Sequence, residues 1–502
     1  MSVREVAFAT WLAAVLVAPD VRPDPPAAPA PPAVAAAQPG SAARSPDLVP
    51  ELDAAVRAIA SERALGGAAV GIAILDVDSG HVLASVNEHT AMNPASNAKL
   101  YTAAAALATL HGDHRYETTL SGRVEGGAVA GPLVLRGYGD PSLATGDLWE
   151  LVQGLKEFGV ARVDGDILVD QEFYDEQTTP PAFDQQPNEW ASFRAPVSAV
   201  ALDENCVTMT VRPASPGNPA HVAFEPPGFV DFDGSVRTAA AGGADTVELT
   251  LSGNGPRMRA TVSGAVSSDA KLVRFTRRAE DPRLLPGFAL ASLLDRADVK
   301  VSGSVKLGTR PAGHLIAKHA SAPLSSLLYS LGKQSDNFYA EMIFKSLAAE
   351  GHGRPAHAGD SGEIVARFLD RIGASDPGVV MKNGSGLFDA DRVSAFGTVQ
   401  LLRWAWRDPA IQPEYVAQLS VGGVDGTLRK RFRTDSMRRR VRAKTGTLDD
   451  VIALSGYVLR TDGRGPIAFS IFFNHAAGKQ DGARHAADRL VEVIARWADR
   501  HS

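Results

Sequence analysis

The chain has 502 residues, of which 45% are hydrophobic and 22% charged, and its formal net charge is −6. This is the composition of an ordinary globular protein, long enough for about two to four domains. The acidic balance argues against nucleic acid as the main partner. The single cysteine, Cys206, excludes an intramolecular disulfide, and its strand-like surroundings are typical of a buried structural thiol.

The N-terminus is predicted to be a targeting segment. Residues 1–18 begin with a short basic stretch and continue as an apolar run too short to span a membrane comfortably. Residues 19–46 are rich in proline and alanine and are predicted to be an extended linker. Cleavage would fall near Ala18 or after residues 35–37, and an uncleaved segment would anchor the chain to the membrane. In either case we expect the body of the protein outside the cytoplasm, in the periplasm or cell envelope.

After the linker, the predicted elements are mixed helices and strands, then mostly strands, and then mostly helices. A helix is expected over 48–62, two strands within 67–89 and a helix that opens near Ser96. From 113 to 317, short β-branched stretches alternate with glycine, proline and aspartate turns, which indicates a mostly β region. Later helices are predicted at 324–333, 337–350, 362–373, 394–407 and 483–499, with strands at 451–461 and 466–475.

This order predicts an α+β fold that is interrupted by an insert. The helix-first part at 47–112 and the strand-last part at 318–502 are expected to rejoin in space as one discontinuous domain. Residues 113–317 are expected to form one or more β-rich inserted domains.

The pair Ser96-x-x-Lys99 is the first candidate for chemistry. Residues three apart share a helix face, so the two side chains can touch if a helix begins there, and Pro94 suits a helix start. A serine at a helix N-terminus also meets the positive end of the helix dipole, which favours a developing alkoxide. Ser268 and Lys271 have the same spacing, but in a strand-and-turn context that points them to opposite faces.

Two further short motifs lie in contexts that suit a site. Ser335-Asp336-Asn337 falls between two helical patterns, so both outer side chains can face one site if the tripeptide is a loop. Its alternative is a helix cap. Lys444-Thr445-Gly446-Thr447 lies on a predicted strand, where a glycine lets a ligand approach the backbone closely. The basic stretch 429–444 is interpreted as a solvated rim, or else as a local anion-facing patch beside Lys444.

The motifs S-x-x-K, S-x-N and K-T-G in this order resemble those of the penicillin-binding protein and serine β-lactamase superfamily. Further segments resemble the D-alanyl-D-alanine carboxypeptidase/endopeptidase family, the low-molecular-mass class C penicillin-binding proteins with domains inserted into a transpeptidase-like domain. These segments are "GYGDPSL" (137–143), "GDILVDQEFYD" (165–175), "APVSAVALDEN" (195–205), "NGSGL" (383–387) and "GGVDGTL" (422–428), together with the large insert. The resemblance covers about residues 48–500 and implies an antiparallel sheet flanked by helices.

The resemblance implies a role for each motif residue. Ser96 would be the acylated nucleophile, and Lys99 its base, with a pKa lowered by burial and by the cation of Lys444. Ser335 would relay a proton to the leaving amine, and Asn337 would orient Lys99 and the substrate amide.

The third motif would hold the substrate. Thr445 and Thr447, either side of Gly446, would bind the terminal carboxylate beside Lys444. The backbone N–H groups of Ser96 and Thr447 would form the oxyanion hole. This chain departs from the family at Asn383 and Phe388, where an acid and a hydroxyl are usual.

The implied activity is a serine-type D-Ala-D-Ala carboxypeptidase acting on peptidoglycan stem peptides, with endopeptidase cleavage by the same groups and β-lactams as inhibitors. No cofactor and no metal ligand cluster is expected; His111 and His114 are interpreted as a surface turn. One alternative is a serine β-lactamase, against which stands the lack of an E-x-x-L-N segment between 338 and 443. Another is a catalytically weak peptidoglycan-binding envelope protein.

Overall fold

The computed structural model describes residues 48–309 and 313–501. The predicted signal-like segment at 1–18 and the linker at 19–46 lie outside the described residues. Among the helices of the described ranges, none combines the length and the apolar character needed to cross a membrane.

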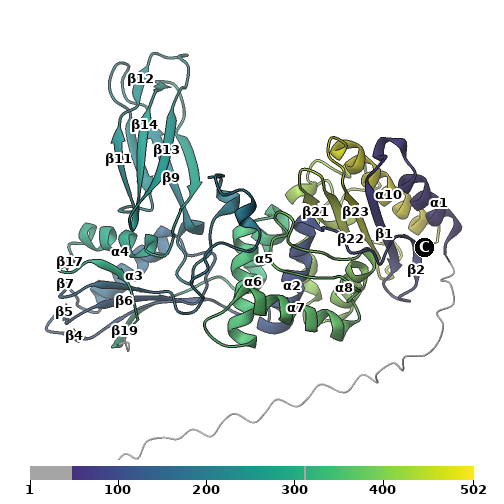
Figure 1. Cartoon of the computed structure of the whole chain (residues 1–502), viewed down its shortest axis with the longest axis horizontal. Helices are drawn as coiled ribbons and strands as arrows, with labels where there is room; N and C mark the ends of the chain where they lie inside the picture. The colour runs from purple at the N-terminus through teal and green to yellow at the C-terminus, as the bar shows by residue number, and fades with distance from the viewer. Residues whose placement is uncertain (1–47, 310–312, 502) are drawn as a thin grey trace, which may run out of the picture. The chain divides into compact units, whose positions relative to one another are not determined.

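A central antiparallel sheet joins segments from both ends of the sequence (Figure 1). Its strand order, within the described part of the chain, is β2-β1-β23-β22-β21-β20. The strands are β1 (Ala69–Asp76), β2 (Val82–Val86), β20 (Ser420–Val421), β21 (Val441–Thr447), β22 (Ile452–Val458) and β23 (Ile467–Asn474). Strand β1 pairs with β23 along its whole length, and Ala69 faces Asn474, 405 positions later in the sequence (474 − 69).

The alternation of side chains along these strands separates two apolar cores. In β23, Phe469 and Ile471 pack toward one face, where α1 (Pro50–Ala60) and α10 (Gln480–Arg500) lie. Ala468 and Phe472, one residue out of step, pack toward the other face. Because successive side chains of a strand point to opposite faces, a continuous apolar run buries both sides of the sheet.

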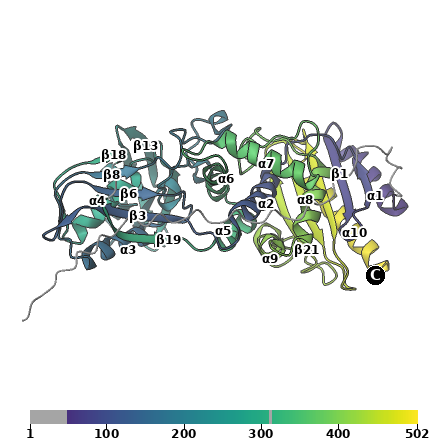
Figure 2. The same cartoon turned by 90° about the horizontal axis from the view of Figure 1, so that it is seen from below.

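The second face is covered by a group of helices, seen on the other side of the sheet in Figure 2. This group comprises α2 (Ala98–Leu110), α5 (Leu324–Tyr329), α6 (Asn337–Gly351), α7 (Ala358–Ile372), α8 (Ala395–Arg407) and α9 (Gln412–Ala417). Helix α2 is rich in alanine, which allows its neighbours to approach closely. Its first ten residues, Ala98 to Leu107, are all buried. The buried N-terminal end of α2 is the end that carries the S-x-x-K motif.

The intervening region contains several smaller sheets. One pairs β18-β8-β6-β3-β19 and another β17-β7-β5-β4. Their bounds are β3 (Glu117–Gly122), β4 (Val124–Glu125), β5 (Ala128–Val129), β6 (Leu133–Gly137), β7 (Arg162–Val163), β8 (Ile167–Asp170), β17 (Lys300–Val301), β18 (Val305–Leu307) and β19 (His314–Ala320). The remaining strands are β9 (Cys206–Arg212), β10 (His221–Glu225), β11 (Val230–Gly234), β12 (Arg237–Ala239), β13 (Glu248–Asn254), β14 (Arg257–Ser263), β15 (Ala265–Ser267) and β16 (Val273–Arg278).

This region also contains two helices that the sequence analysis did not anticipate, α3 (Thr145–Glu157) and α4 (Leu285–Arg296). Their presence follows from the sheet topology. Strand β6 pairs with β8 in parallel, and β8 pairs with β18 in parallel. Parallel neighbours need a crossover connection, which is usually a helix, and α3 and α4 lie in these two connections.

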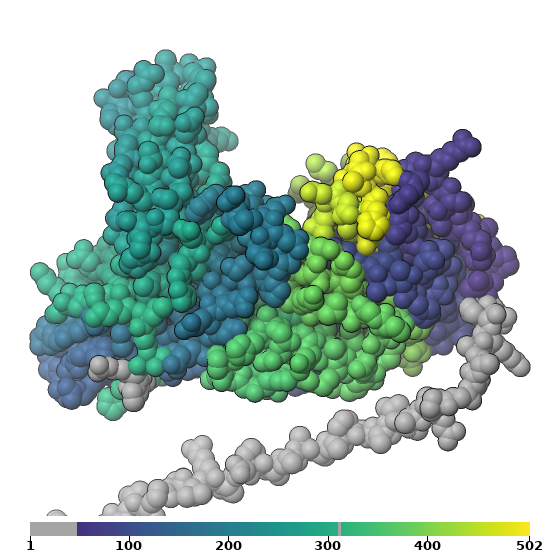
Figure 3. Space-filling model, viewed as in Figure 1, coloured from purple at the N-terminus to yellow at the C-terminus, as the bar shows by residue number. Residues whose placement is uncertain are grey.

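The intervening region contacts α6 through a small core of its own. Phe173 and Tyr174 pack with Phe338 and Met342. The Tyr174 hydroxyl donates to the carbonyl of Met342 at 2.8 Å and lies 2.8 Å from the hydroxyl of Ser346. In Figure 3 the blue residues of this region adjoin the green ones without a gap. The boundaries at 47–112, 113–317 and 318–502 stay predictions.

Candidate active site

Ser96 lies on a tight turn directly before α2. The turn is a 3-10 helix over Ala95–Asn97, and the α-helix itself begins at Ala98, two residues later than the sequence predicts. Ala95 has a positive φ of 46°, which is costly for an alanine, and its N–H donates to the side chain of Asn93 at 2.8 Å. The surrounding structure therefore holds the residue before Ser96 in a strained conformation, and Ser96 itself is partly exposed.

Lys99 faces Ser96 from the first turn of α2 and is completely buried. Its ammonium donates three hydrogen bonds: 3.1 Å to the hydroxyl of Ser96, 2.8 Å to the amide oxygen of Asn337 and 2.8 Å to the carbonyl of Ser385. Burial lowers the pKa of Lys99 to about 8, against the opposing charges of nearby carboxylates, of which Glu341 is the strongest. A lysine with this pKa can accept a proton near neutral pH.

Two glycines allow the turn of Ser96 to pack tightly. A Cβ added to Gly446 of the K-T-G motif would lie 2.8 Å from the carbonyl of Pro94. A Cβ on Gly386 would lie 1.8 Å from the carbonyl of Ala95, and Gly386 also has a φ of 72°. The sequence suggested that the space at Gly446 admits a ligand, whereas the nearest atoms belong to Pro94 and Ala95 beside Ser96 and to Ala453 of β22.

The S-x-N motif spans the junction before α6. Ser335 has a left-handed φ of 62° and ends a short π-helix over Ser330–Gln334. Asp336 caps α6 by accepting from the N–H of Tyr339 at 3.0 Å, and Asn337 is the first residue of the helix. The tripeptide is therefore both a helix cap and part of the site. Asp336 provides the cap, while Ser335 contacts Lys444 and Asn337 contacts Lys99.

Lys444 lies in the middle of β21 and is also completely buried. It donates 2.8 Å hydrogen bonds to the hydroxyl of Ser335 and to the carbonyl of Thr445. Burial lowers its pKa well below the usual lysine value, and the positive charge of Lys99 lowers it further. The sequence predicted that Lys444 lowers the pKa of Lys99, whereas burial lowers the pKa of Lys99 and the charge effect acts from Lys99 on Lys444.

The remaining K-T-G residues lie at the open side of β21. Thr445 is partly exposed, and Thr447 is exposed. The hydroxyl of Thr445 donates to that of Thr427 at 2.9 Å, so the "GGVDGTL" segment lies beside this motif. Asp425 of the same segment forms an ion pair with Lys333 at 2.8 Å.

Two buried carboxylates that the sequence analysis missed hold the "NGSGL" loop in place. Glu341 accepts from the N–H groups of Gly384 at 3.1 Å and Ser385 at 2.8 Å. Asp391 accepts from the N–H groups of Lys382 and Asn383, and burial raises its pKa to about 7. These contacts fix the carbonyl of Ser385 against Lys99. No motif indicates the two carboxylates, because they bind backbone N–H groups of the loop.

Asn383, where an acid was expected, is completely buried and does not line the cleft. Its amide donates to the carbonyls of Pro181 at 3.0 Å and Leu387 at 3.2 Å, and its oxygen accepts from Gly386. Phe388, in place of the usual hydroxyl, packs edge-on against Phe183, with ring centroids 5.8 Å apart. Asn383 thus shapes the loop from within.

The intervening region also reaches the site. The amide of Asn337 donates to the carbonyl of Phe193 at 3.0 Å, from a 3-10 helix over Ser192–Arg194. The sequence carries no signal for this contact, which joins residues far apart in the chain. The ring of Phe193 is 45% exposed.

The other candidates lie elsewhere. Within the described ranges, no hydrogen bond joins Ser268 to Lys271, and Lys271 is exposed. Cys206 is buried as a free thiol whose pKa burial raises. In the basic stretch, Arg431 and Arg440 pair with Asp488 and Asp499 of α10.

A partly exposed serine beside a buried lysine, a second serine–lysine pair between Ser335 and β21, and an antiparallel sheet flanked by helices together define the penicillin-binding class of serine acyl-transfer proteins. The model of the D-Ala-D-Ala carboxypeptidase 3 (S13) family matches residues 52–496, and the chain belongs to this family. The predicted family and enzyme class, a serine-type D-Ala-D-Ala carboxypeptidase, are therefore confirmed.

Curated relatives agree with this assignment. The chain is 34% identical to a D-alanyl-D-alanine carboxypeptidase of Actinomadura sp. (strain R39), over 88% of this chain and 84% of the relative. It is 26% identical to the D-alanyl-D-alanine carboxypeptidase DacB of Haemophilus influenzae, over 81% of this chain and 86% of the relative.

The solved structures extend the agreement to the fold. Penicillin-binding protein 4 (dacB) of Haemophilus influenzae matches with a TM-score of 0.71 and 24% identity, covering 87% of this chain and 99% of that one. The same protein complexed with a β-lactam matches with a TM-score of 0.69, 24% identity, and coverage of 88% and 99%. The predicted α+β, penicillin-binding fold class is confirmed.

Proposed function

We propose that Ser96 is the acylated nucleophile of this carboxypeptidase and that Lys99 is its general base. The observation that carries the proposal is the contact of 3.1 Å between the Ser96 hydroxyl and a completely buried lysine. With a pKa of about 8, about one-tenth of Lys99 is uncharged at pH 7. That fraction supplies a base next to the hydroxyl without a histidine.

The reaction proceeds in two balanced steps. The oxygen of Ser96 attacks the carbonyl carbon of the D-Ala-D-Ala peptide bond, and its proton passes to Lys99. The C–N bond then breaks as the leaving amine takes, through Ser335, the proton that Lys99 had accepted, which leaves an ester on Ser96, free D-alanine and a neutral Lys99. Water attacks the ester, gives a proton to Lys99 and releases the shortened peptide, which restores the serine hydroxyl.

Binding of the substrate would use the opposite wall of the cleft. Lys444 is buried with an unfavourable charge, so a terminal carboxylate of the peptide beside it would be stabilised. Thr445 and Thr447 would donate hydroxyl hydrogen bonds to that carboxylate, and Gly446 keeps this strand close to the serine turn. The backbone N–H groups of Ser96 and Thr447 would form the oxyanion hole.

The substrates and inhibitors follow from this chemistry. We propose peptidoglycan stem peptides as the substrate and β-lactams as acylating inhibitors; the Haemophilus protein with the same fold binds a β-lactam in its crystal. Peptidoglycan lies outside the cytoplasm, and we place the enzyme in the periplasm or cell envelope, with membrane anchorage if the N-terminal segment is uncleaved. Nucleic acid is not among the proposed partners.

Labelling with a fluorescent penicillin tests the nucleophile. The wild-type chain and Ser268→Ala are expected to form a stable labelled band on a denaturing gel, and Ser96→Ala is expected to form none. D-alanine release from a pentapeptide ending in D-Ala-D-Ala should follow the same pattern. Labelling of Ser96→Ala at the wild-type level would overturn the assignment of Ser96.

Two other assays separate the alternatives. Release of peptide from a cross-linked muropeptide, measured beside D-alanine release, tests the additional endopeptidase activity. A serine β-lactamase would hydrolyse its penicilloyl ester within seconds, whereas a carboxypeptidase should retain the label for minutes or longer. A peptidoglycan-binding protein without activity would sediment with cell walls but take no label.

A further inference from the structure

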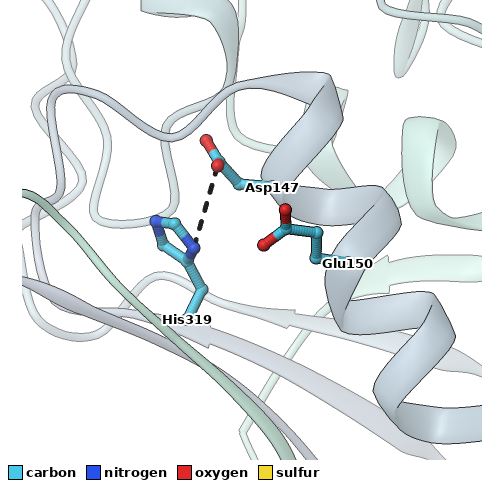
Figure 4. A group of neighbouring side chains, drawn as sticks. All are labelled: Asp147, Glu150 and His319. Carbon is cyan, nitrogen blue, oxygen red and sulfur yellow. Dashed lines mark ion pairs between the residues drawn. The ribbon is translucent and has the colours of Figure 1, made fainter.

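A second cluster of chemistry-bearing side chains lies in the intervening region, away from Ser96. It comprises Asp147 and Glu150, one turn apart on α3, and His319 on the neighbouring strand β19 (Figure 4). One ligand atom from each residue lies within 4.8 Å of the other two. The three side chains point toward one another from two different elements.

A fourth residue behind the cluster has an unsatisfied atom. Asp140 is only 2% exposed, and its Oδ2 has no hydrogen-bond partner. This oxygen lies 3.7 Å from Nε2 of His319, while the other oxygen, Oδ1, accepts from the N–H and the hydroxyl of Ser142. A buried carboxylate oxygen without a donor is costly, so it requires an explanation.

The two nitrogens of His319 are divided between these neighbours. Nε2 faces the buried Asp140, and Nδ1 faces Oδ1 of Asp147 at 3.9 Å. A histidine that binds a metal through one nitrogen characteristically donates its other N–H to a carboxylate, which fixes the ring. A cation at Nδ1 would therefore place the proton on Nε2, where Asp140 can accept it.

The two acidic residues are suited to complete such a site. Oδ2 of Asp147 accepts from the N–H of Ala144 at 2.8 Å, which anchors the side chain and leaves Oδ1 turned to His319. Glu150 is exposed, so its carboxylate is free to rotate. Zinc binds nitrogen and carboxylate oxygen at about 2.0–2.2 Å, which places ligand atoms about 3–3.5 Å apart. A rotation of Glu150, together with a shift of about half an ångström between Asp147 and His319, would close the difference.

We propose that His319, Asp147 and Glu150 bind a divalent transition-metal cation of the zinc class, with Asp140 as the carboxylate that orients His319. One imidazole and two carboxylates favour such a cation over calcium or magnesium, which prefer oxygen ligands alone. The cation would tie α3 to β19. The sequence analysis expected no metal site, because His319 is separated from the two acidic residues by most of the intervening region.

Titration of the metal-stripped full chain tests the proposal. Isothermal calorimetry with ZnCl2 should show one ion bound per chain, and CoCl2 should produce the visible absorption of a four-coordinate cobalt site. His319→Gln and Glu150→Gln should each weaken zinc binding at least tenfold. The matched controls His314→Gln, on the same strand, and Glu157→Gln, on the same helix, should bind as the wild type does.

The thermal midpoint provides a second measurement of zinc binding. Zinc should also raise the thermal midpoint of the wild type but not of Glu150→Gln, whose exposed substitution does not threaten folding. Absence of one-to-one zinc binding in the wild type, or equal binding in all five proteins, would overturn the proposal and leave His319 and Asp140 as an ion pair alone. Calcium binding as tight as zinc binding would overturn the assigned class of cation.

Discussion

A lysine that acts as a base must lose the proton that it would hold in water. At Lys99 the cost of burying a charge competes with the attraction of Glu341 and other carboxylates, and burial has the larger effect on the pKa. Both the charged and the neutral form of Lys99 carry N–H groups, so either form can donate to the carbonyl of Ser385. This hydrogen bond keeps the amine directed toward Ser96. The site thus keeps its geometry while its proton is mobile.

The rate of Ser96 acylation should depend on pH through Lys99. A lysine whose pKa is lowered to about 8 is charged below that pH and neutral above it. The second-order rate of labelling by a fluorescent penicillin should therefore rise about tenfold per pH unit below pH 8 and level off above it. Lys99→Arg, which stays protonated, should lose labelling, whereas Lys271→Arg should keep it. A flat profile from pH 6 to 9.5 would contradict this base.

The variant Asn337→Asp offers a directional check of the same idea. Asn337 accepts from Lys99 at 2.8 Å, and a carboxylate in its place would favour the charged lysine. The pKa of Lys99 should rise, and the midpoint of the labelling profile should move to higher pH. A midpoint that moves to lower pH, or stays unchanged while the enzyme folds and labels, would exclude Lys99 as the titrating group.

Asn383, which stands where the family usually has an acid, has a structural role in this chain. Its amide donates to two carbonyl oxygens in a fully buried position. In Asn383→Asp these carbonyls would face a carboxylate, at a cost of about 1–3 kcal/mol in the free energy of unfolding. Because the charged form is the unfavourable one, the loss should grow as the pH rises. Chemical denaturation at pH 4 and pH 7, on either side of the range in which a buried aspartate with this cost titrates, checks this. The exposed Asn188→Asp serves as control, and equal stability of both variants at pH 7 would contradict the prediction.

At the scale of elements, the catalytic geometry depends on how closely β21 packs against the turn before α2. Gly446 carries no positive φ, so its requirement is one of space. The nearest atoms to its absent Cβ are the carbonyl of Pro94 and the Cβ atoms of Ala95 and Ala453. The absence of a side chain at Gly446 therefore allows β21, which we propose binds the substrate, to pack directly against the turn that carries Ser96.

Gly446→Ala should separate these two elements. The added Cβ would lie 2.8 Å from a backbone oxygen and 3.0 Å from two other carbons, none of which can rotate away. We expect penicillin labelling to slow at least tenfold and the thermal midpoint to fall. Gly359→Ala in α7, where a Cβ meets no atom within 4 Å, should keep wild-type labelling. Normal labelling of Gly446→Ala would show that the contact is not needed.

The periodicity of apolar residues predicted most helices and strands, because each one buries a face that the sequence pattern reveals. Helices α3 and α4 were missed because short β-branched stretches dominate their surroundings, and the parallel pairing that requires them is a long-range property. The same limit applies within the site. Ser96, Lys99, Ser335 and Lys444 belong to motifs, whereas Glu341 and Asp391 act through backbone atoms that no motif records.

At the scale of the whole molecule, α6 connects the site with the intervening region. Its first residue, Asn337, contacts both Lys99 and the carbonyl of Phe193. Further along the same helix, Lys345 forms a buried ion pair with Asp175. The intervening region is therefore attached to the helix whose first residue, Asn337, contacts Lys99. The sequence indicated the insert but not this contact, since it depends on the folded position of a single carbonyl.

This attachment places an exposed aromatic ring beside the cleft. Phe193 is 45% exposed although its carbonyl is fixed by Asn337. Exposed aromatic side chains next to a site serve as binding surface for the apolar parts of a ligand. We expect a peptide that extends past the reacting bond to contact this ring and a small β-lactam to contact it less.

Phe193→Ala should therefore affect long substrates selectively. We expect KM for a stem pentapeptide to rise about three- to tenfold, since burying part of an aromatic ring contributes about 1 kcal/mol. Labelling by penicillin should stay within about twofold of wild type, because the backbone contact with Asn337 is kept. Phe158→Ala, at a ring that is 50% exposed at the end of α3, serves as the matched control and should change neither quantity. Equal loss of both activities would mean that Phe193 supports the fold of the site, and no loss of either would mean that peptides do not pass it.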